Sequence, residues 1–315
     1  MRKIRLLSIF LIIVFFFSNV SILPGSRHFI QFGAEKVYSE GIDSYTKLLM
    51  HFDGINGSAS FSDVCGKSVT VRGNAQISTS QSKFGGASGA FNGSGDYLSV
   101  QDSDDWIFSS EDFTIDTWVK AASFSNDDYP SMLTIIHGNT EGTAGIRTFV
   151  LYIDSITRTV GFQCSNDGIN WSTTINGTTP IQTNTWYHIA VVRNGNSIRL
   201  YLNGLLEISS PIAGAIYAPI AYQSVGIGAY VPTKLNCYFN GYIDELRISK
   251  GIARWTSNFT PPSSLYNWMP NINLISPSQN GTFISKNQNE RIERINITRK
   301  KWHAKKRYRF SSAGD

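Results

Sequence analysis

The stretch WYHIAVVRNGNSIRLYLNG, residues 186–204, predicts a β-hairpin. Residues 186–193 are rich in the aromatic and β-branched residues that favour strands. Asn194-Gly195-Asn196 follows, and Asn and Gly are the residues that tight hairpin turns require. Residues 197–203 then predict the returning strand, and a second Asn-Gly pair turns the chain into LLEIS. The hairpin therefore predicts neighbouring antiparallel strands.

A second segment, FTIDTWVK (residues 113–120), predicts a strand with apolar groups on both faces. Successive side chains of a strand point to opposite faces, so Phe113 and Val119 share one face while Asp116 and Trp118 share the other. We expect a central strand here. Similar short runs, separated by Gly, Asn, Asp and Ser, extend from Lys47 to about Tyr266, and helical periodicity is almost absent. The pattern predicts an all-β fold, a two-sheet antiparallel β-sandwich or jelly roll.

Charge is distributed unevenly along the 315 residues. Residues 1–41 hold five basic and two acidic residues, residues 286–315 hold ten and three, and the middle of the chain holds 13 and 18. This mildly acidic body argues against a nucleic-acid-binding surface on the domain itself. The three cysteines, with no C-x-x-C spacing, allow at most one disulfide, and we expect free buried thiols.

The amino terminus predicts export. Arg2, Lys3 and Arg5 precede an apolar run at residues 6–17, which is the length of a signal-peptide core and short for a membrane span. Residues 1–41 are thus expected to form a signal peptide or an uncleaved N-terminal anchor. We expect association with a membrane only if this segment stays uncleaved. The mature protein is expected to be secreted or at the cell surface.

The carboxyl-terminal part differs from the body. The segment NFTPPSSLYNWMP (258–270) predicts a linker, because paired prolines and serines interrupt regular structure. We therefore divide the chain into residues 1–41, a domain at 42–269, and a linker with a basic tail at 270–315. The tail has too little apolar surface to fold alone, so it is expected to be disordered or to be a truncated second β-domain. Its RKKWHAKKRYR run (299–309) leaves binding of an anionic polymer open.

Five sequence blocks occur in the order typical of one family. They resemble the laminin G-like domains of the concanavalin A-like lectin/glucanase superfamily, in the form common in bacterial and phage surface proteins, over residues 45–266. The resemblance implies a jelly roll whose first and last strands lie side by side. The blocks are KLLMHFDG, SKFGGASGAFNGSGDYLSV, FTIDTWVK, TWYHIAVVRNGNSIRLYLNG and FNGYIDELRISKGIARWTSNFTPP.

The carboxylate spacing argues against an enzyme. Glucanases of this fold are expected to carry Glu-x-Asp-x-x-Glu in one strand, so that the acids of the catalytic pair share a face. No glutamate in the chain fits that spacing, and no Gly-x-Ser-x-Gly elbow supports a serine nucleophile. We expect no catalytic residues, and a glycoside hydrolase is the least favoured class.

The resemblance also implies a structural Ca²⁺ site. If the first and last strands are neighbours, Asp53 and Asp244 come close together, and loop carbonyls would supply further oxygen ligands. The alternative is that Asp53 caps a turn before Gly54 and Asp244 bonds a neighbouring loop. Glu245 is expected on the opposite strand face, exposed and paired with Arg247.

Sugar binding by such domains relies on exposed aromatic rings supported by polar side chains. The aromatic residues near expected turns are therefore the candidate ligand-binding residues, and for each one a packing role is the alternative. Trp118, Trp186 and Phe91 are expected to pack in the core, and Trp255 over the sandwich beside a paired or solvated Arg254. The candidates are Trp171, Tyr129, Tyr222 and Tyr230.

Together these patterns predict an exported, non-catalytic binding module for a carbohydrate or another cell-surface ligand. The alternative is a purely structural or assembly domain of a surface or phage-like protein. Fold alone does not decide between them.

Overall fold

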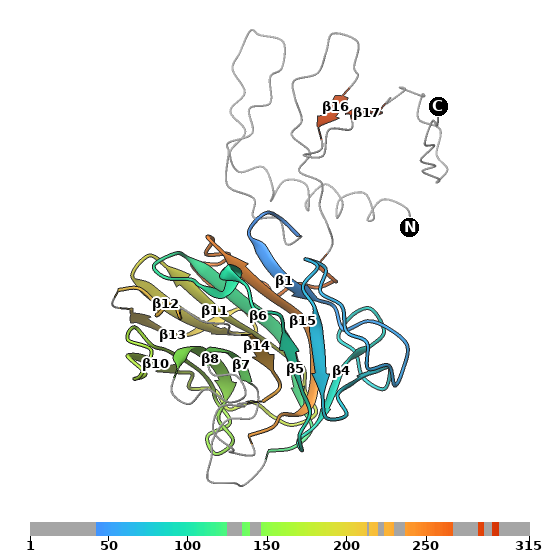
Figure 1. Ribbon diagram of the computed structural model, residues 1–315, viewed down its shortest axis with the longest axis horizontal. Helices are drawn as coiled ribbons and strands as arrows, with labels where there is room; N and C mark the ends of the chain where they lie inside the picture. Colours follow the sequence, from blue (N-terminus) through green and yellow to red (C-terminus); the bar gives the residue numbers. More distant parts are fainter. Residues whose placement is uncertain are drawn as a thin grey trace, which may run out of the picture. The chain divides into compact units, whose positions relative to one another are not determined.

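A computed structural model gives the fold of the chain (Figure 1). It describes residues 42–124, 146–212, 214–219, 224–229 and 237–266, together with the strand backbones at 134–138, 283–286 and 292–295. The contacts divide the chain into two units, Met1–Tyr266 and Asn267–Asp315. The expected signal segment and most of the basic tail lie outside the described residues. In the second unit, β16 (Phe283–Lys286) pairs antiparallel with β17 (Ile292–Ile295).

The first unit is an antiparallel two-sheet sandwich, as predicted. One sheet has eight strands. Seven of them form a continuous series of paired neighbours, and the eighth, β1 (Thr46–Met50), pairs with β15. The spatial order of the seven is β13 (Leu205–Pro211), β12 (Ser197–Leu202), β11 (Tyr187–Asn194), β6 (Phe113–Ala121), β15 (Asn240–Lys250), β4 (Ser88–Asn92) and β3 (Gln76–Ser78).

The other sheet has seven strands. A short 3₁₀ helix, η1 (Asp104–Trp106), follows its strand β5. The spatial order is β10 (Thr173–Asn176), β9 (Val160–Cys164), β8 (Arg147–Ile153), β7 (Thr134–Gly138), β14 (Val225–Ile227), β5 (Tyr97–Val100) and β2 (Val69–Arg72).

The two segments that predicted the fold form its centre. Strands β11 and β12 pair from Ile189–Leu202 to Asn194–Ser197, which leaves Gly195 and Asn196 as the two-residue turn. Gly195 has φ 57°, a left-handed conformation that glycine adopts without strain. Strand β6 lies between β11 and β15, and eight of its nine residues are buried. The prediction of a central strand is confirmed.

The main hydrophobic core lies between the two sheets. Alternate residues of β6 and β8, such as Phe113, Ile115, Phe149 and Leu151, belong to it and are fully buried. Phe91 packs in this core, as expected, and Trp186 is half-buried. Trp118 is buried too, but outside this core, against Phe84 and His188 on the outer face of β6. The cysteines are free thiols, but Cys65 is exposed rather than buried. No helix in the described part of the chain is long and apolar enough to cross a membrane.

Strand β15 joins the beginning and the end of the domain. On one side it pairs with β6. On its other side it pairs first with β4, as far as Ile243, and then with β1, from Leu246 to Ser249. The first and last strands of the domain are therefore neighbours, as the resemblance implied. Asp244 and Glu245 lie at the gap between β4 and β1 and have no strand partner on that side.

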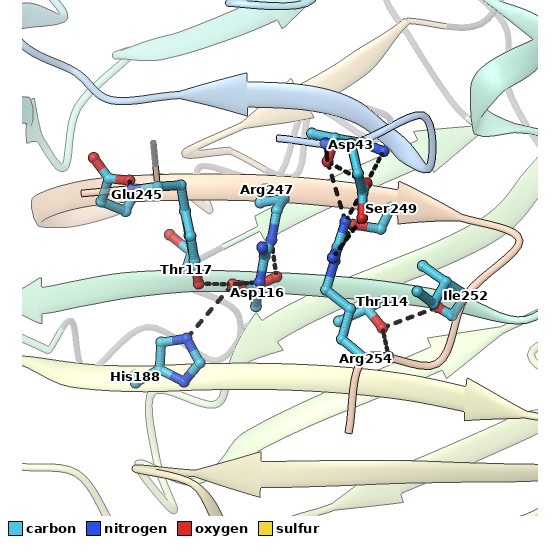
Figure 2. A network of polar contacts seen from close by, with 12 residues as sticks. Asp43, Thr114, Asp116, Thr117, His188, Glu245, Arg247, Ser249, Ile252 and Arg254 are labelled. Atoms are coloured by element: carbon cyan, nitrogen blue, oxygen red, sulfur yellow. Dashed lines mark hydrogen bonds and ion pairs between the residues drawn. The ribbon is translucent and has the colours of Figure 1, made fainter. Parts of the chain in front are cut away.

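The outer face of the eight-stranded sheet carries a buried polar network (Figure 2). Asp116 on β6 accepts hydrogen bonds from Arg247 Nε at 3.0 Å and Nη2 at 3.3 Å, and from the hydroxyl of Tyr266. Burial alone would raise the pKa of Asp116, but the Arg247 guanidinium and His188 lower it to about 2. Arg247 also lies over the Tyr266 ring, 3.8 Å from its centroid. The network satisfies charges that would otherwise be costly to bury.

Residues 251–266, here called the closing segment, cover this polar face. Arg254 donates to both carboxylate oxygens of Asp43 and to Ser249 Oγ (Figure 2). Trp255 stacks on Phe259 with ring centroids 4.0 Å apart, and both rings meet the edge of buried His188. The expected packing of Trp255 and pairing of Arg254 are confirmed. The closing segment is thus held by ion pairs and by aromatic contacts.

Removal of the Asp116 carboxylate should be strongly destabilising. Asp116→Ala removes the carboxylate that pairs with the buried Arg247 guanidinium. We expect the free energy of unfolding to fall by about 3–5 kcal/mol. Urea unfolding followed by circular dichroism measures this change. Glu111→Gln is the control, because Glu111 is half-exposed and 3.5 Å from Lys250, and we expect a change below about 1 kcal/mol. Equal effects of the two substitutions would contradict the role given to Asp116.

Candidate functional site

The gap along β15 between β4 and β1 holds a cluster of carboxylates. Asp244 is fully buried there, and its Oδ2 accepts hydrogen bonds from the backbone amides of Lys83, at 2.7 Å, and Phe84, at 3.1 Å. Its other oxygen, Oδ1, is buried and has no hydrogen-bond partner. An unpartnered buried carboxylate oxygen is unfavourable unless a further group bonds it. Asp244 therefore has one oxygen free for a ligand.

Asp53 approaches the same loop from the segment after β1. Its carboxylate accepts a hydrogen bond from the Ala87 amide and lies directly against Gly85. A Cβ at Gly85 would overlap both carboxylate oxygens, and Gly85 has φ 62°, so glycine is required here for two reasons. Asp53 is exposed to solvent, whereas Asp244 is not. Both predicted metal ligands thus contact the loop of residues 83–87.

Burial and neighbouring negative charges oppose ionisation of the two aspartates. Burial raises the pKa of Asp244 to about 7, and the negative charges of Glu245 and Asp53 add to this effect. Burial also raises the pKa of Asp53. A divalent cation would relieve both the desolvation and the mutual repulsion of these carboxylates.

The donor chemistry fits Ca²⁺. Carboxylate oxygens are the ligands that Ca²⁺ prefers, and it takes about six to eight oxygens in a flexible arrangement. Among the described residues no group of three or more His, Cys, Asp or Glu side chains is arranged around a metal position. A cation held by Asp53 and Asp244 would therefore need backbone carbonyls or water as its remaining ligands. The Ca²⁺ site stays a prediction that the unpartnered Oδ1 supports.

The expectation for Glu245 is wrong. Glu245 is fully buried, its Oε1 lies 2.7 Å from His51 Nδ1, and its Oε2 accepts a hydrogen bond from the Tyr266 amide at 2.9 Å. The cause is a β-bulge between Asp244 and Arg247, in which Glu245 has φ 48°. A bulge redirects the side chains that follow, so strict alternation no longer assigns their faces. Arg247 accordingly pairs with Asp116 and not with Glu245.

Of the predicted ligand-binding aromatic residues, the structure describes Trp171. Tyr129, Tyr222 and Tyr230 lie outside the described residues. Trp171 is half-buried just before β10, where it packs on Val150 and Tyr152 of β8. The Arg147 guanidinium lies 5.6 Å from the centroid of its ring. Trp171 therefore has a packing role and keeps part of its surface exposed.

Strands β8, β9 and β10 place further polar groups beside Trp171, on the face that points away from the main core. The Tyr152 ring lies across Gly161, where a Cβ would overlap it, and its hydroxyl donates to Asn176 Oδ1 at 2.7 Å. Gln163 and Thr174 are cross-strand partners on the same face. We call this set, Tyr152, Gln163, Trp171, Thr174 and Asn176, the outer platform. Sequence reasoning missed all of it except Trp171, although the alternation of RTFVLYI and VGFQC separates these residues from the core positions.

The seven strands of this sheet contain no Asp or Glu residue. Retaining and inverting glycosidases need two carboxyl groups, about 5–5.5 Å or about 6.5–9.5 Å apart. The strands of this sheet supply no such pair. The five residues of the outer platform thus carry amide, hydroxyl and aromatic groups, and the Arg147 guanidinium is a charged group beside Trp171.

The fold defines the class of the protein, an antiparallel two-sheet jelly-roll domain. A laminin G family model, described as the concanavalin A-like lectin/glucanases superfamily, matches residues 92–254, more than half of the chain. The chain belongs to this superfamily. Comparison with curated proteins finds no match.

Several solved structures are similar to this chain at low sequence identity. The binding domain of Paraclostridial Mosquitocidal Protein 1 is 16% identical with a TM-score of 0.49, and the match covers 67% of this chain and 50% of that domain. Domain 4 of AbnA, an extracellular arabinanase from Geobacillus stearothermophilus solved with arabinotriose, is 18% identical with a TM-score of 0.46, covering 66% and 95%. The CBM40 domain of Ruminococcus gnavus IT-sialidase, bound to α2,3-sialyllactose, is 19% identical with a TM-score of 0.38, covering 46% and 78%. The chain thus spans about half the length of the toxin binding domain it matches.

The approach of Asp53 to Gly85 can be tested with two glycine substitutions. Gly85→Ala and Gly86→Ala both place alanine at a positive φ, which costs about 1–2 kcal/mol. Only Gly85→Ala adds an overlap with Asp53, because nothing lies within 4 Å of a Cβ at Gly86. We expect Gly85→Ala to reduce the free energy of unfolding by at least about 1 kcal/mol more than Gly86→Ala does. Equal losses in urea unfolding would show that Asp53 does not lie against Gly85.

The pKa of Asp244 predicts a pH dependence of stability in EDTA. Its carboxyl has a pKa of about 7 in the folded protein against an ordinary value of 3.8, so the folded state holds a proton that the unfolded state has lost. Its contribution therefore makes stability fall as pH rises from about 4 to about 7. We expect Asp244→Asn, which cannot ionise, to lack this part of the decline. The measurement is urea unfolding of both proteins across that pH range, and a constant difference between them would contradict the assigned pKa.

Proposed function

We propose that this chain is an exported, non-catalytic binding module that recognises carbohydrate on the outer platform of its seven-stranded sheet. The observation that carries the proposal is the combination on one face of aromatic rings, amides and hydroxyls, with no carboxylate among the residues of its strands. The amino-terminal sequence supports export to the cell surface or beyond, because a basic start precedes an apolar run of signal-peptide length.

The platform has the chemistry that sugar recognition needs. Pyranose rings present apolar faces to aromatic side chains, while their hydroxyls bond to amide and hydroxyl groups. Trp171 supplies a half-exposed ring, and Asn176 and Thr174 are exposed on the adjacent strand. The hydrogen bond between the Tyr152 hydroxyl and Asn176 orients these two side chains before a ligand arrives. Preorganisation of this kind reduces the entropy lost on binding.

The absence of acids from the seven strands supports a binding role over hydrolysis. The described carboxylates that share a site, Asp53, Asp244 and Glu245, belong to the other sheet and to the segment after β1. There they bond backbone amides and His51. In our proposal these groups stabilise the domain, with Ca²⁺ as a structural ion at Asp53 and Asp244.

The proposal is tested by glycan-array binding of the full chain, followed by affinity measurements on the best ligand. We expect Trp171→Ala to weaken binding about tenfold or more, equivalent to about 1.4 kcal/mol, because it removes the exposed ring. Asn176→Ala should also weaken binding, through the loss of an amide and of the Tyr152 contact. Tyr45→Ala is the matched control, since Tyr45 is 44% exposed and precedes β1 of the other sheet.

Two results would contradict the proposal. If no glycan binds, a structural or assembly domain becomes the better interpretation. If a glycan binds and Trp171→Ala, Asn176→Ala and Tyr45→Ala all retain wild-type affinity, the ligand site lies elsewhere on the domain. Urea unfolding of each variant separates a loss of contact from a loss of fold.

A further inference from the structure

We propose that Glu207 is a positioning residue for the outer platform. Its carboxylate holds the turn at residues 177–179, which directly follows Asn176, and thereby fixes the Asn176 side chain for a carbohydrate ligand. The inference rests on the proposed binding function. It assigns a role in that function to an acidic residue of the opposite sheet, which acts through Asn176 and does not itself contact the sugar.

Glu207 reaches from one sheet to the other. Its strand, β13, is an edge of the eight-stranded sheet, and it lies beside β10, an edge of the seven-stranded sheet (Figure 1). Along β12, Leu200 pairs with Ile208 and the next residue, Tyr201, pairs with Leu206, so Glu207 is the extra residue of a β-bulge. A bulge re-aims the side chains beside it. The Glu207 carboxylate accordingly contacts the turn that follows β10.

Four hydrogen bonds join the Glu207 carboxylate to this turn. Oε2 accepts from the amides of Thr178, at 2.8 Å, and Thr179, at 2.9 Å, and from Thr178 Oγ1 at 3.2 Å. Oε1 accepts from Thr179 Oγ1 at 2.9 Å. Gly177 lies against the same carboxylate, because a Cβ there would be 3.2 Å from Oε2. Hydrogen bonds to an ionised acceptor are stronger than those between neutral groups, so one side chain holds the whole turn.

On one side, Asn176 is held by its neighbours in the seven-stranded sheet. It pairs with Gly161 of β9, and the amide of the next residue, Gly177, donates to the Val160 carbonyl at 2.8 Å. Asn176 Oδ1 accepts the hydrogen bond of the Tyr152 hydroxyl, and a Cβ at Gly161 would overlap both groups. With Oδ1 engaged in this way, the Nδ2 group of the exposed Asn176 can donate to a sugar hydroxyl.

On the other side, the backbone after Asn176 depends on Glu207. Residues 178–180 are exposed, and the amides of Thr178 and Thr179 both donate to the Glu207 carboxylate. The chain is fully buried again at Ile181. Exposed turns with few buried contacts are the parts of a fold that open most readily. Loss of the carboxylate would therefore release the turn and let Asn176 leave the geometry in which it meets the ligand.

A double-mutant cycle on the full chain tests the inference, with the oligosaccharide that gives the strongest glycan-array signal as the probe. We expect Glu207→Ala to weaken binding about threefold to tenfold, because apparent affinity falls with the fraction of molecules that hold the binding geometry. Added to Asn176→Ala, the same substitution should cost nothing further, since Glu207 acts through Asn176. Added to Trp171→Ala, it should cost its full factor, because the aromatic contact is independent of the turn.

Two further variants and a measurement without ligand complete the test. Glu207→Gln is the conservative variant: its oxygen can accept from the two amides and its Nε2 can donate to Thr179 Oγ1, so we expect affinity within about twofold of wild type. Glu111→Gln is the matched control, because Glu111 lies beside Lys250 at another part of the domain. The side-chain amide resonances of Asn176 in NMR spectra should shift in Glu207→Ala and stay unchanged in Glu111→Gln.

Three outcomes would overturn the inference. The first is wild-type affinity in Glu207→Ala, which would leave the carbohydrate proposal intact. The second is the same loss from Glu207→Ala whether Asn176 is present or replaced by alanine, which would give Glu207 only a general structural role. The third is the absence of glycan binding by the wild-type chain, which would remove the proposed function together with this inference. If Glu207→Ala fails to fold, Glu207→Asp, which withdraws the carboxylate by one methylene group, takes its place in the cycle.

Discussion

The domain is organised around the two residues of β15 that have no strand partner on one side. Strand β4 ends its pairing at Ile243 and β1 begins at Leu246, so the bulge at Asp244 and Glu245 opens toward the loop of residues 83–87. Unpaired backbone in the interior must find other partners. The Asp244 carbonyl accepts a hydrogen bond from Thr117 Oγ1, and the carboxylates of Asp244 and Glu245 in turn bond backbone amides of two separate segments. The gap in the sheet is therefore also the place where the two ends of the domain meet.

The two faces of the sandwich are stabilised differently. The space between the sheets is filled by apolar side chains, whose burial is the main driving force for folding. The outer face of the eight-stranded sheet instead carries buried charges, with Asp116, Arg247 and Arg254 each satisfied by named partners. Ion pairs of this kind give little net stability but make loss of one partner costly. The closing segment is consequently part of the fold rather than an appendage.

Local patterns predicted the strands well and the charged contacts poorly. The hairpin at 186–204 and the central strand at 113–120 follow from alternation and turn residues, which act over a few positions. Very short strands, such as β2 and β3, have too few residues to show a period. The sequence assigned the Glu245 side chain to the wrong face, because a single β-bulge shifts the register of this strand. No residue pattern in YIDELRIS indicates such a bulge. The Asp116–Arg247 pair spans 131 positions, so only the tertiary fold brings its members together. For the candidate sites, the resemblance implied that Asp53 and Asp244 come close together, and the structure places each of them against the loop of residues 83–87. Apart from Trp171, sequence reasoning missed the outer platform.

The gap in β15 joins the two ends of the domain, because Glu245 contacts both His51 after β1 and the amide of Tyr266 in the closing segment. The most direct test is a crystal structure of the chain. The account predicts a β-bulge at Asp244 and Glu245, with Glu245 buried and its two carboxylate oxygens on His51 and on the Tyr266 amide. A regular strand in which Glu245 points to solvent and Tyr266 lies away from β15 would contradict it.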